Sequence, residues 1–364
     1  EILRQAQDDN TIREYTFDTS SFLILTNMIK GLIIFYFSGT GNSKKIADWF
    51  AECAMQTDIP CQIVDISKTD IHALPEIEKD LLILFVSPTH GFNYPQIMLD
   101  FIRRFPKGLN PVVLTNTRAG FKLGKTVIPG LTGIALMLSS FFLNRKGYKI
   151  VGQIPFDMPS NWISIHPALR DKSIDFLYTK NRERVKRHFT ILNTKGKDFA
   201  AYKNIVQDIL ISPVALAYYF VGRYFLSKSY YASHQCTNCN TCIKQCPVNA
   251  ITVKNQRPYW TFKCESCMKC MNNCPHHAIE TTHGLWLFVI YISSIITTYL
   301  MTKTLLSDNQ HWLIQFLLFN CILIIFTGIF YRMQQWLLKN NFLANIIAKT
   351  SLTHYRFWGR YKSR

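Results

Sequence analysis

Two cysteine runs of identical spacing constrain this 364-residue chain more than any other feature. Both follow the pattern C-x₂-C-x₂-C-x₃-C-P, with cysteines at Cys236, Cys239, Cys242 and Cys246 and again at Cys264, Cys267, Cys270 and Cys274. Three closely spaced thiolates can bind three irons of a cubane, and the fourth thiolate must come from farther away. The pattern therefore predicts two [4Fe–4S] clusters. Four-coordinate zinc is the alternative, but zinc explains neither the third cysteine nor the proline of each run.

The fourth cysteine of each run is assigned to the cluster of the other run, as in two-cluster ferredoxins. One cluster is predicted on Cys236, Cys239, Cys242 and Cys274, and the other on Cys264, Cys267, Cys270 and Cys246. Similar segments follow the two prolines, so two related halves of ββ or βα type are expected. A chain with two such clusters is expected to carry electrons.

The remaining cysteines and the net charge indicate the compartment and the partners of the chain. Cys53, Cys61 and Cys321 are scattered, which argues against a disulfide framework and favours a reducing compartment. The formal net charge is +18, yet the chain carries no nucleic-acid recognition motif. We therefore interpret the charge as attraction to an anionic membrane surface and to acidic redox partners, and expect no nucleic-acid binding.

A phosphate-binding loop is predicted near the start of the chain. The apolar run Gly31 to Phe37 is typical of a buried parallel strand, and residues 44–55 show a helical pattern. Between them lie Ser38, Gly39, Thr40, Gly41, Asn42 and Ser43. Backbone N–H groups at the start of a helix bind anions, and hydroxyls add donors. The loop is too short for a Walker loop and lacks its lysine, so a monophosphate is favoured over a nucleoside triphosphate.

The following segments predict a doubly wound parallel sheet. Further strands are expected at 62–66, 81–87, 111–116 and 148–154, with helices near 95–105 and 126–145. Loops 38–43, 87–94 and 116–122 then meet at the carboxyl edge of the sheet, where such folds bind ligands.

These three loops resemble the flavin mononucleotide (FMN) loops of flavodoxins. Together with the cysteine runs, residues 30–280 are similar to EFR1-type ferredoxins, in which a flavodoxin-like domain is fused to a two-cluster ferredoxin domain. The resemblance implies two cofactor types, FMN and two [4Fe–4S] clusters. It assigns FMN contacts to Ser38, Gly39, Thr40, Gly41, Asn42, Ser43, Pro88, Thr89, His90, Gly91, Phe92, Tyr94, Thr117, Arg118, Ala119 and Gly120. Lys44, Lys45, Arg118 and Lys122 predict a positive flavin site, which would stabilise the reduced flavin.

Two uncharged stretches, Gly284 to Met301 and Trp312 to Tyr331, are long enough to cross a hydrocarbon core. They predict a transmembrane hairpin, with two buried core helices as the alternative. The basic residues after the second stretch place the C-terminus and the redox domains on the cytoplasmic side, which makes this a multi-pass protein of the cytoplasmic membrane. The apolar stretch Ile205 to Leu226 is expected to lie in the membrane interface, with a single membrane span as the alternative.

The fold class expected is an α/β flavodoxin-like doubly wound sheet, an α+β two-[4Fe–4S] ferredoxin domain and an α-helical transmembrane hairpin. The predicted boundaries are an N-terminal extension (1–29), an FMN domain (30–160), a helical basic linker with the interfacial helix (161–230), a ferredoxin domain (231–283), the two transmembrane helices (284–331) and a basic cytoplasmic tail (332–364).

The expected function is a membrane-attached relay of electrons between FMN and the two clusters, to or from a membrane-associated redox partner. The alternative is a reductase that acts directly on a membrane quinone or another small lipid-soluble substrate. We assign no catalytic acid or base, and the sequence leaves open whether the chain is also an enzyme.

Overall fold

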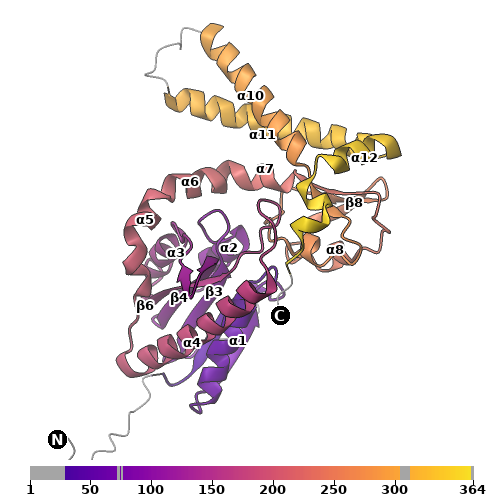
Figure 1. The fold of residues 1–364 in the computed structure, drawn as a ribbon. Helices are drawn as coiled ribbons and strands as arrows, with labels where there is room; N and C mark the ends of the chain where they lie inside the picture. Colours follow the sequence, from indigo (N-terminus) through magenta and orange to yellow (C-terminus); the bar gives the residue numbers. More distant parts are fainter. Residues whose placement is uncertain (1–28, 72–73, 75–76, 304–311, 362–364) are drawn as a thin grey trace, which may run out of the picture.

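The computed structural model describes residues 29–71, 74, 77–303 and 312–361. The predicted N-terminal extension lies outside the described residues except for Ile29. Residues 29–195 form the sheet domain, residues 228–282 form the cysteine domain, and apolar helices follow (Figure 1).

Five parallel strands form the core of the sheet domain. They are β1 (Leu32–Tyr36), β2 (Cys61–Asp65), β3 (Leu82–Pro88), β4 (Pro111–Leu123) and β6 (Lys149–Pro159), in the order β2-β1-β3-β4-β6. The side chains of β1 are buried throughout, as expected for a strand covered on both faces. The short β5 (Thr126–Ile128) pairs antiparallel with the end of β4. The predicted doubly wound sheet is confirmed.

Helices cover both faces of this sheet. The apolar sides of α1 (Asn42–Met55) and α4 (Asp171–Lys195) share one core, and those of α2 (Gln96–Arg104) and α3 (Ala135–Asn144) share the other. The sequence predicts a basic linker over residues 171–195, but α4 packs on α1 and β6. Most of its charged residues lie on its outer face, whereas Leu177, Val185 and Phe189 are buried.

Strands β4 and β6 are longer than predicted, so segment 115–120 is not a loop. It continues β4 and pairs with β6, for example Thr117 with Phe156 and Gly120 with Pro159. The helix expected over 126–145 is also shorter, because β5 and a loop precede α3. Buried polar partners, described below, stabilise this extension of the sheet.

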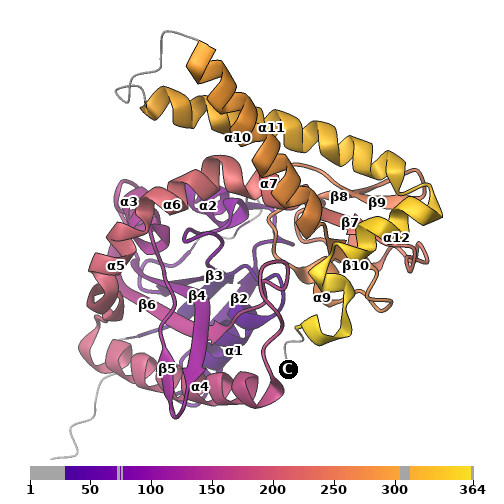
Figure 2. The same cartoon turned by 45° about the horizontal axis from the view of Figure 1, so that its top comes forward.

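A curved run of short helices, residues 200–227, leads from the sheet domain to the cysteine domain, and we call it the helical arc. It comprises η3 (Ala200–Asn204), α5 (Ile205–Leu210), α6 (Ser212–Ala217), the π-helical turn η4 (Tyr218–Gly222) and α7 (Arg223–Ser227). The arc bends by 74° between residues 210 and 212, where Pro213 opens a new helix. It lies between the sheet domain and the apolar helices in both views (Figures 1 and 2).

The cysteine domain contains two halves of the same plan. In each half a cysteine loop leads into a short helix and then a strand: α8 (Thr241–Lys244) with β8 (Ile251–Lys254), and α9 (Lys269–Asn272) with β10 (Ile279–Thr281). Two antiparallel pairs complete it, β10 with β7 (Tyr230–Ala232) and β8 with β9 (Arg257–Trp260).

Two long helices, α10 (His283–Lys303) and α11 (Trp312–Leu337), pack against each other, and α12 (Asn341–Lys349) follows. Within the described residues, α11 is the one unbroken helix long and apolar enough to cross a membrane, and the two parts of the bent arc pass the same test only together. The apolar part of α10 is shorter, Trp286–Leu300.

The C-terminal segment, residues 350–361, belongs to the predicted basic cytoplasmic tail, and it packs on both domains. The Trp358 indole donates a hydrogen bond to the Ile163 carbonyl oxygen in the sheet domain, at 2.5 Å. The Tyr361 N–H donates to the Asn272 side-chain oxygen in the cysteine domain, at 2.7 Å. This segment therefore ties the two domains together.

Candidate functional site

A cavity of about 400 Å³ opens at the carboxyl edge of the sheet, and we call it the edge cavity. Its volume is within the usual range for small-molecule sites. Two of the predicted loops and the extended part of β4 meet there. The predicted contacts that line it are Ser38, Gly39, Thr40, Asn42, Ser43, Pro88, Thr89, His90, Gly91, Phe92, Thr117, Arg118 and Ala119. Gly41, Gly120 and Tyr94 do not line it. The Tyr94 side chain is buried and donates to the Thr115 carbonyl oxygen at 2.7 Å.

Two further aromatic residues also line the edge cavity, Trp162 and Tyr218. The Trp162 ring lies between His90 and Tyr218, at centroid distances of 5.9 Å and 5.7 Å. Tyr218 presses so closely on Gly91 that a Cβ there would lie 2.1 Å from the ring. Gly91 also has φ +53°, so a glycine is required on both grounds. Tyr218 comes from the helical arc, and no local pattern of the sequence connects it to this loop.

The start of α1 suits a phosphate. Gly41 adopts φ 104°, its N–H donates to the Ser38 hydroxyl oxygen at 3.0 Å, and no side chain caps the helix. The first turn of α1 carries no acidic residue. Its N–H groups are thus free to meet an anion, as the phosphate of FMN would require. The Ser43 and Thr117 hydroxyls lie 2.9 Å apart beside it.

Asn42 has a different role from the predicted phosphate contact. Its side-chain amide donates to the Pro159 carbonyl oxygen at 2.7 Å. Its side-chain oxygen accepts hydrogen bonds from the hydroxyls of Tyr178 and Tyr361. Asn42 therefore anchors α4 and the C-terminal segment to the edge cavity.

Each cation of the predicted positive flavin site has a partner. Lys44 pairs with Asp48 at 2.8 Å, and Arg118 pairs with Asp157 at 2.7 Å. The Lys45 ammonium lies over the Trp49 and Tyr178 rings, and that of Lys122 over Phe176.

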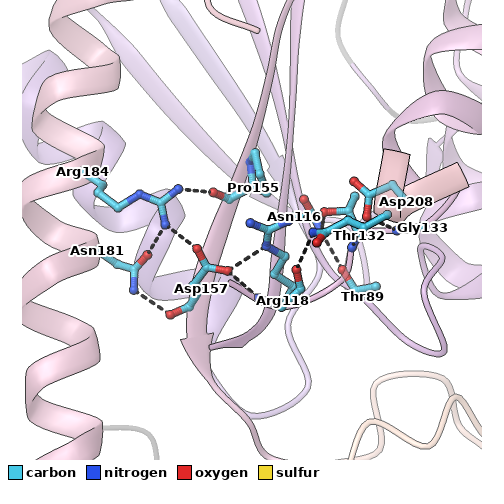
Figure 3. A network of polar contacts seen from close by, with 12 residues as sticks. Thr89, Asn116, Arg118, Thr132, Gly133, Pro155, Asp157, Asn181, Arg184 and Asp208 are labelled. Atoms are coloured by element: carbon cyan, nitrogen blue, oxygen red, sulfur yellow. Dashed lines mark hydrogen bonds and ion pairs between the residues drawn. The ribbon is translucent and has the colours of Figure 1, made fainter. Parts of the chain in front are cut away.

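Arg118 belongs to a buried polar network behind the edge cavity (Figure 3). Asp157 of β6 accepts from both Arg118 of β4 and Arg184 of α4, at 2.7 Å and 2.8 Å. Arg118 also donates to the Thr132 hydroxyl at 3.1 Å. The N–H of Thr132 donates in turn to Asp208 of the helical arc at 2.8 Å. The network therefore joins the sheet, α4 and the arc.

The cysteines form two groups that match the crossed assignment. The Cys242 thiol interacts electrostatically with those of Cys236, Cys239 and Cys274, and these four line one small cavity. We call them the outer cysteine set. The Cys270 thiol interacts likewise with those of Cys264, Cys267 and Cys246, which we call the inner cysteine set.

The donor chemistry of both sets fits a [4Fe–4S] cluster. The fourth cysteine of each run accepts a backbone N–H at its sulfur, Ala250 to Cys246 at 3.2 Å and Ala278 to Cys274 at 3.4 Å. Among the described residues, no three His, Cys, Asp or Glu side chains are arranged to hold a single metal ion. A cubane needs each thiolate on a different iron, whereas zinc needs four around one ion.

The inner cysteine set lies against the edge cavity. A Cβ on Gly39 would lie 2.6 Å from the Cys267 Cβ, so the predicted phosphate loop directly contacts a cluster-ligand residue. Asn161 bridges the same contact, since its amide donates to the Thr40 hydroxyl and to the Cys267 carbonyl oxygen, at 2.5 Å and 3.4 Å. The Glu265 carboxylate accepts the N–H groups of Gln96 and Ile97 at the start of α2.

Comparisons with known proteins agree with both domains. The flavodoxin family model matches residues 34–138, and that of the 4Fe–4S dicluster domain matches residues 235–279. No curated protein matches the chain. The chain therefore contains a flavodoxin domain and a 4Fe–4S dicluster domain, which together imply an electron-transfer flavo-iron–sulfur protein.

Similar solved structures include an archaeal flavodoxin (15% identity, 44% of this chain and 99% of that chain, TM-score 0.27). Flavodoxin 2 of Bacillus cereus is 17% identical over 45% of this chain and 99% of that chain, with a TM-score of 0.31. The rubredoxin:oxygen oxidoreductase of Desulfovibrio gigas is 12% identical over 45% of this chain and 37% of that chain, with a TM-score of 0.29.

His90 should make the sheet domain sensitive to mild acid. Burial lowers the pKa of its imidazole from 6.5 to about 4. The unfolded chain therefore binds this proton first, and stability is lost as the pH falls from 6.5 towards 4. When the pH falls from 7.5 to 5.5, the free energy of unfolding should decrease by about 1 kcal/mol more in this protein than in a His90→Gln variant, because the unfolded chain binds the proton of His90. Urea unfolding followed by tryptophan fluorescence measures this difference.

Glu265 is a nearby carboxyl that titrates in the same range, because burial raises its pKa to about 7. Its effect on stability has the opposite sign to that of His90. Since Glu265 is present in both proteins, the comparison with the variant isolates the effect of His90. Equal losses of stability in the two proteins would contradict the assignment to His90.

Lys228 should raise the reduction potential of a cluster on the inner set. Its ammonium is buried, donates to the Trp260 carbonyl oxygen and lies 4.2–4.9 Å from three aromatic centroids, those of Tyr259, Phe262 and Tyr331. Burial lowers the pKa of Lys228 to about 8, and its charge interacts with Cys264. At pH 7 this cation favours the more negative, reduced cluster.

We expect a Lys228→Met variant to lower the midpoint of one cluster by about 60 mV, a tenfold change in its reduced-to-oxidised ratio at fixed potential. EPR-monitored titration measures the midpoint, and Lys228→Arg should retain it. Lys254→Met is the matched control, because Lys254 also lies over Tyr259 but is exposed. Equal shifts in the Met variants would show that Lys228 has no special effect.

Proposed function

We propose that this protein is a membrane-attached electron-transfer protein of the EFR1 type, which relays electrons between FMN and two [4Fe–4S] clusters. FMN exchanges two electrons and passes them on singly, and each cluster carries one. The relay runs to or from a membrane-associated redox partner.

The contact between the edge cavity and the inner cysteine set carries this proposal. Gly39 of the cavity touches Cys267, and Asn161 bonds to both sides of the contact. Glu265 adds a second link, because its carboxylate accepts the N–H groups of Gln96 and Ile97 in the sheet domain. Three side chains, His90, Trp162 and Tyr218, form the aromatic wall of the cavity. Two cofactors held on either side of one van der Waals contact are close enough for direct electron exchange.

The exposed apolar helices support membrane attachment. Only 11% of the most apolar window of α11 is buried, whereas a core helix of a water-soluble domain would be mostly buried. On α10, Leu287 and Tyr291 are likewise exposed. We propose that α10 and α11 form a transmembrane hairpin, with the redox domains and the C-terminus in the cytoplasm. The arc exposes Val206, Leu210 and Phe220, and we propose that this side rests in the membrane interface.

His283, at the start of the hairpin, is not positioned to donate a proton to a quinone. His283 uses both ring nitrogens, one with the Ser164 carbonyl oxygen at 2.9 Å and one with the Leu352 N–H at 3.1 Å. Its role is to hold segments together. We therefore favour the relay over the reductase.

An anaerobic redox titration of detergent-purified protein tests the proposal. We expect about eight irons and one FMN per chain, with both cofactor types reducible. In a separate experiment, washing membranes with carbonate should leave the protein in the membrane. Iron without FMN would overturn the flavin relay and leave the sheet domain as a docking module. Release by carbonate would overturn the transmembrane hairpin while leaving the relay intact.

A further inference from the structure

We infer that a small, soluble, acidic one-electron carrier docks over the outer cysteine set and exchanges electrons there with the relay. The inference rests on the proposed function and names a second partner, distinct from the one at the membrane. In the direction tested below, the reduced carrier gives one electron to the oxidised cluster on the outer set. The carrier is oxidised by one electron, and no proton or group moves.

The two cysteine sets differ in what can approach them. Cys267 of the inner set is only 9% exposed, and the flavodoxin-like sheet domain covers its loop. Cys239 of the outer set is exposed, as are its neighbours Asn238 and Asn240. Helix α8 and strand β8 lie at the end of the molecule away from the sheet domain (Figure 1). An external protein can therefore approach the outer set, while the inner set faces the edge cavity.

The edge cavity lies at the other end of the relay. Gly39 of its lining contacts Cys267 of the inner set, and the helical arc contributes Val214 and Tyr218 to the same lining. The arc also exposes apolar side chains, which we propose rest in the membrane interface. The order along the relay is thus edge cavity, inner set, outer set.

The surface around the outer set is positive because both acidic residues of the cysteine domain are buried. Within residues 228–282 the acids are Glu265 and Glu280, at 9% and 1% exposure. Glu265 accepts two N–H groups of α2, and Glu280 accepts the Tyr231 hydroxyl at 2.5 Å. Lys244 of α8 and Lys254 of the β8–β9 hairpin, in contrast, are exposed. A domain that exposes lysines and no carboxylate attracts an acidic partner.

A shallow hollow beside the outer set offers a contact surface. It has a volume of about 220 Å³ and lies between the loop of Asn238 and Asn240 and the β8–β9 hairpin. Val253, which is 57% exposed, lines it together with Gln256 and Arg257. An apolar contact within a polar, charged rim is the usual anatomy of a small transient interface.

Stopped-flow mixing of the intact protein in detergent with a reduced plant-type ferredoxin, an acidic one-electron carrier, tests the inference. We expect the second-order rate constant to fall steeply with salt. A Lys244→Glu/Lys254→Glu variant should be at least tenfold slower than the parent at low salt. Lys107→Glu/Lys125→Glu, on exposed lysines of the sheet domain, is the matched control and should stay within twofold.

The docking surface would be overturned if the rate constant fell equally in both variants or fell in neither. Faster exchange with a basic carrier, such as a c-type cytochrome, would also overturn it. The reduction potentials and the internal transfer between flavin and clusters should be unchanged in the Lys244→Glu/Lys254→Glu variant. Loss of internal transfer in the parent protein would instead overturn the proposed relay, so the two failures are distinguishable.

Discussion

Replacing Cys246 with alanine should remove the cluster of the inner set, although Cys246 belongs to the first cysteine run. The Cys270 thiol interacts with Cys246 together with Cys264 and Cys267, so the loss of Cys246 leaves that cluster with three ligands. We expect the variant to retain about four of about eight irons and to lose electron transfer between flavin and the remaining cluster, because the cluster nearest the edge cavity is missing. Iron analysis and flash reduction of the flavin measure the two effects.

Cys274→Ala is the mirror-image control. Cys274 stands in the second run but lies with Cys236, Cys239 and Cys242 in the outer set. This variant should also lose about four irons, yet keep rapid transfer between flavin and the inner cluster. It should lose exchange with an external carrier instead. If the two variants show the opposite pattern, each run binds its own cluster and the crossed assignment fails.

The sequence predicted those features that depend on local spacing. The spacing within each short cysteine run identifies its cysteines as cluster ligands. The strand-loop-helix pattern over 31–55 predicts the anion site at the start of α1. Both are properties of short segments, so no knowledge of the fold was needed. The parallel sheet followed from the alternation of such segments.

Features that depend on distant partners were missed. Tyr218 lies 127 positions beyond Gly91 in the sequence, yet its ring lies against that glycine. The basic composition of the C-terminal segment gave no sign that Trp358 and Tyr361 attach it to both domains. A lysine or arginine in the sequence likewise does not reveal the carboxylate or ring that pairs with it at the edge cavity.

A second large effect is expected at Asp157, the centre of the buried network of Figure 3. Its carboxylate accepts from Arg118 and Arg184 and from the Gly130 N–H. The Arg118 and Asp157 side chains are 2% and 6% exposed. Asp157→Ala leaves the Arg118 guanidinium buried without its carboxylate, a loss that costs about 3–5 kcal/mol in comparable buried pairs. Urea unfolding of the sheet domain, followed by tryptophan fluorescence, should show this loss.

Two variants separate the buried charge from a general loss of packing at Asp157. Asp48→Ala removes a carboxylate from the exposed Lys44 pair of α1, and we expect a change of at most about 1 kcal/mol there. Adding Arg118→Met to Asp157→Ala removes the unpaired cation, so the double variant should be more stable than Asp157→Ala alone. Arg184 is 26% exposed at its side chain and can be hydrated when Asp157 is lost. A double variant less stable than the single one would show that Arg118 stabilises the extended strands through its packing and its bond to Thr132, and that the ion pair contributes little.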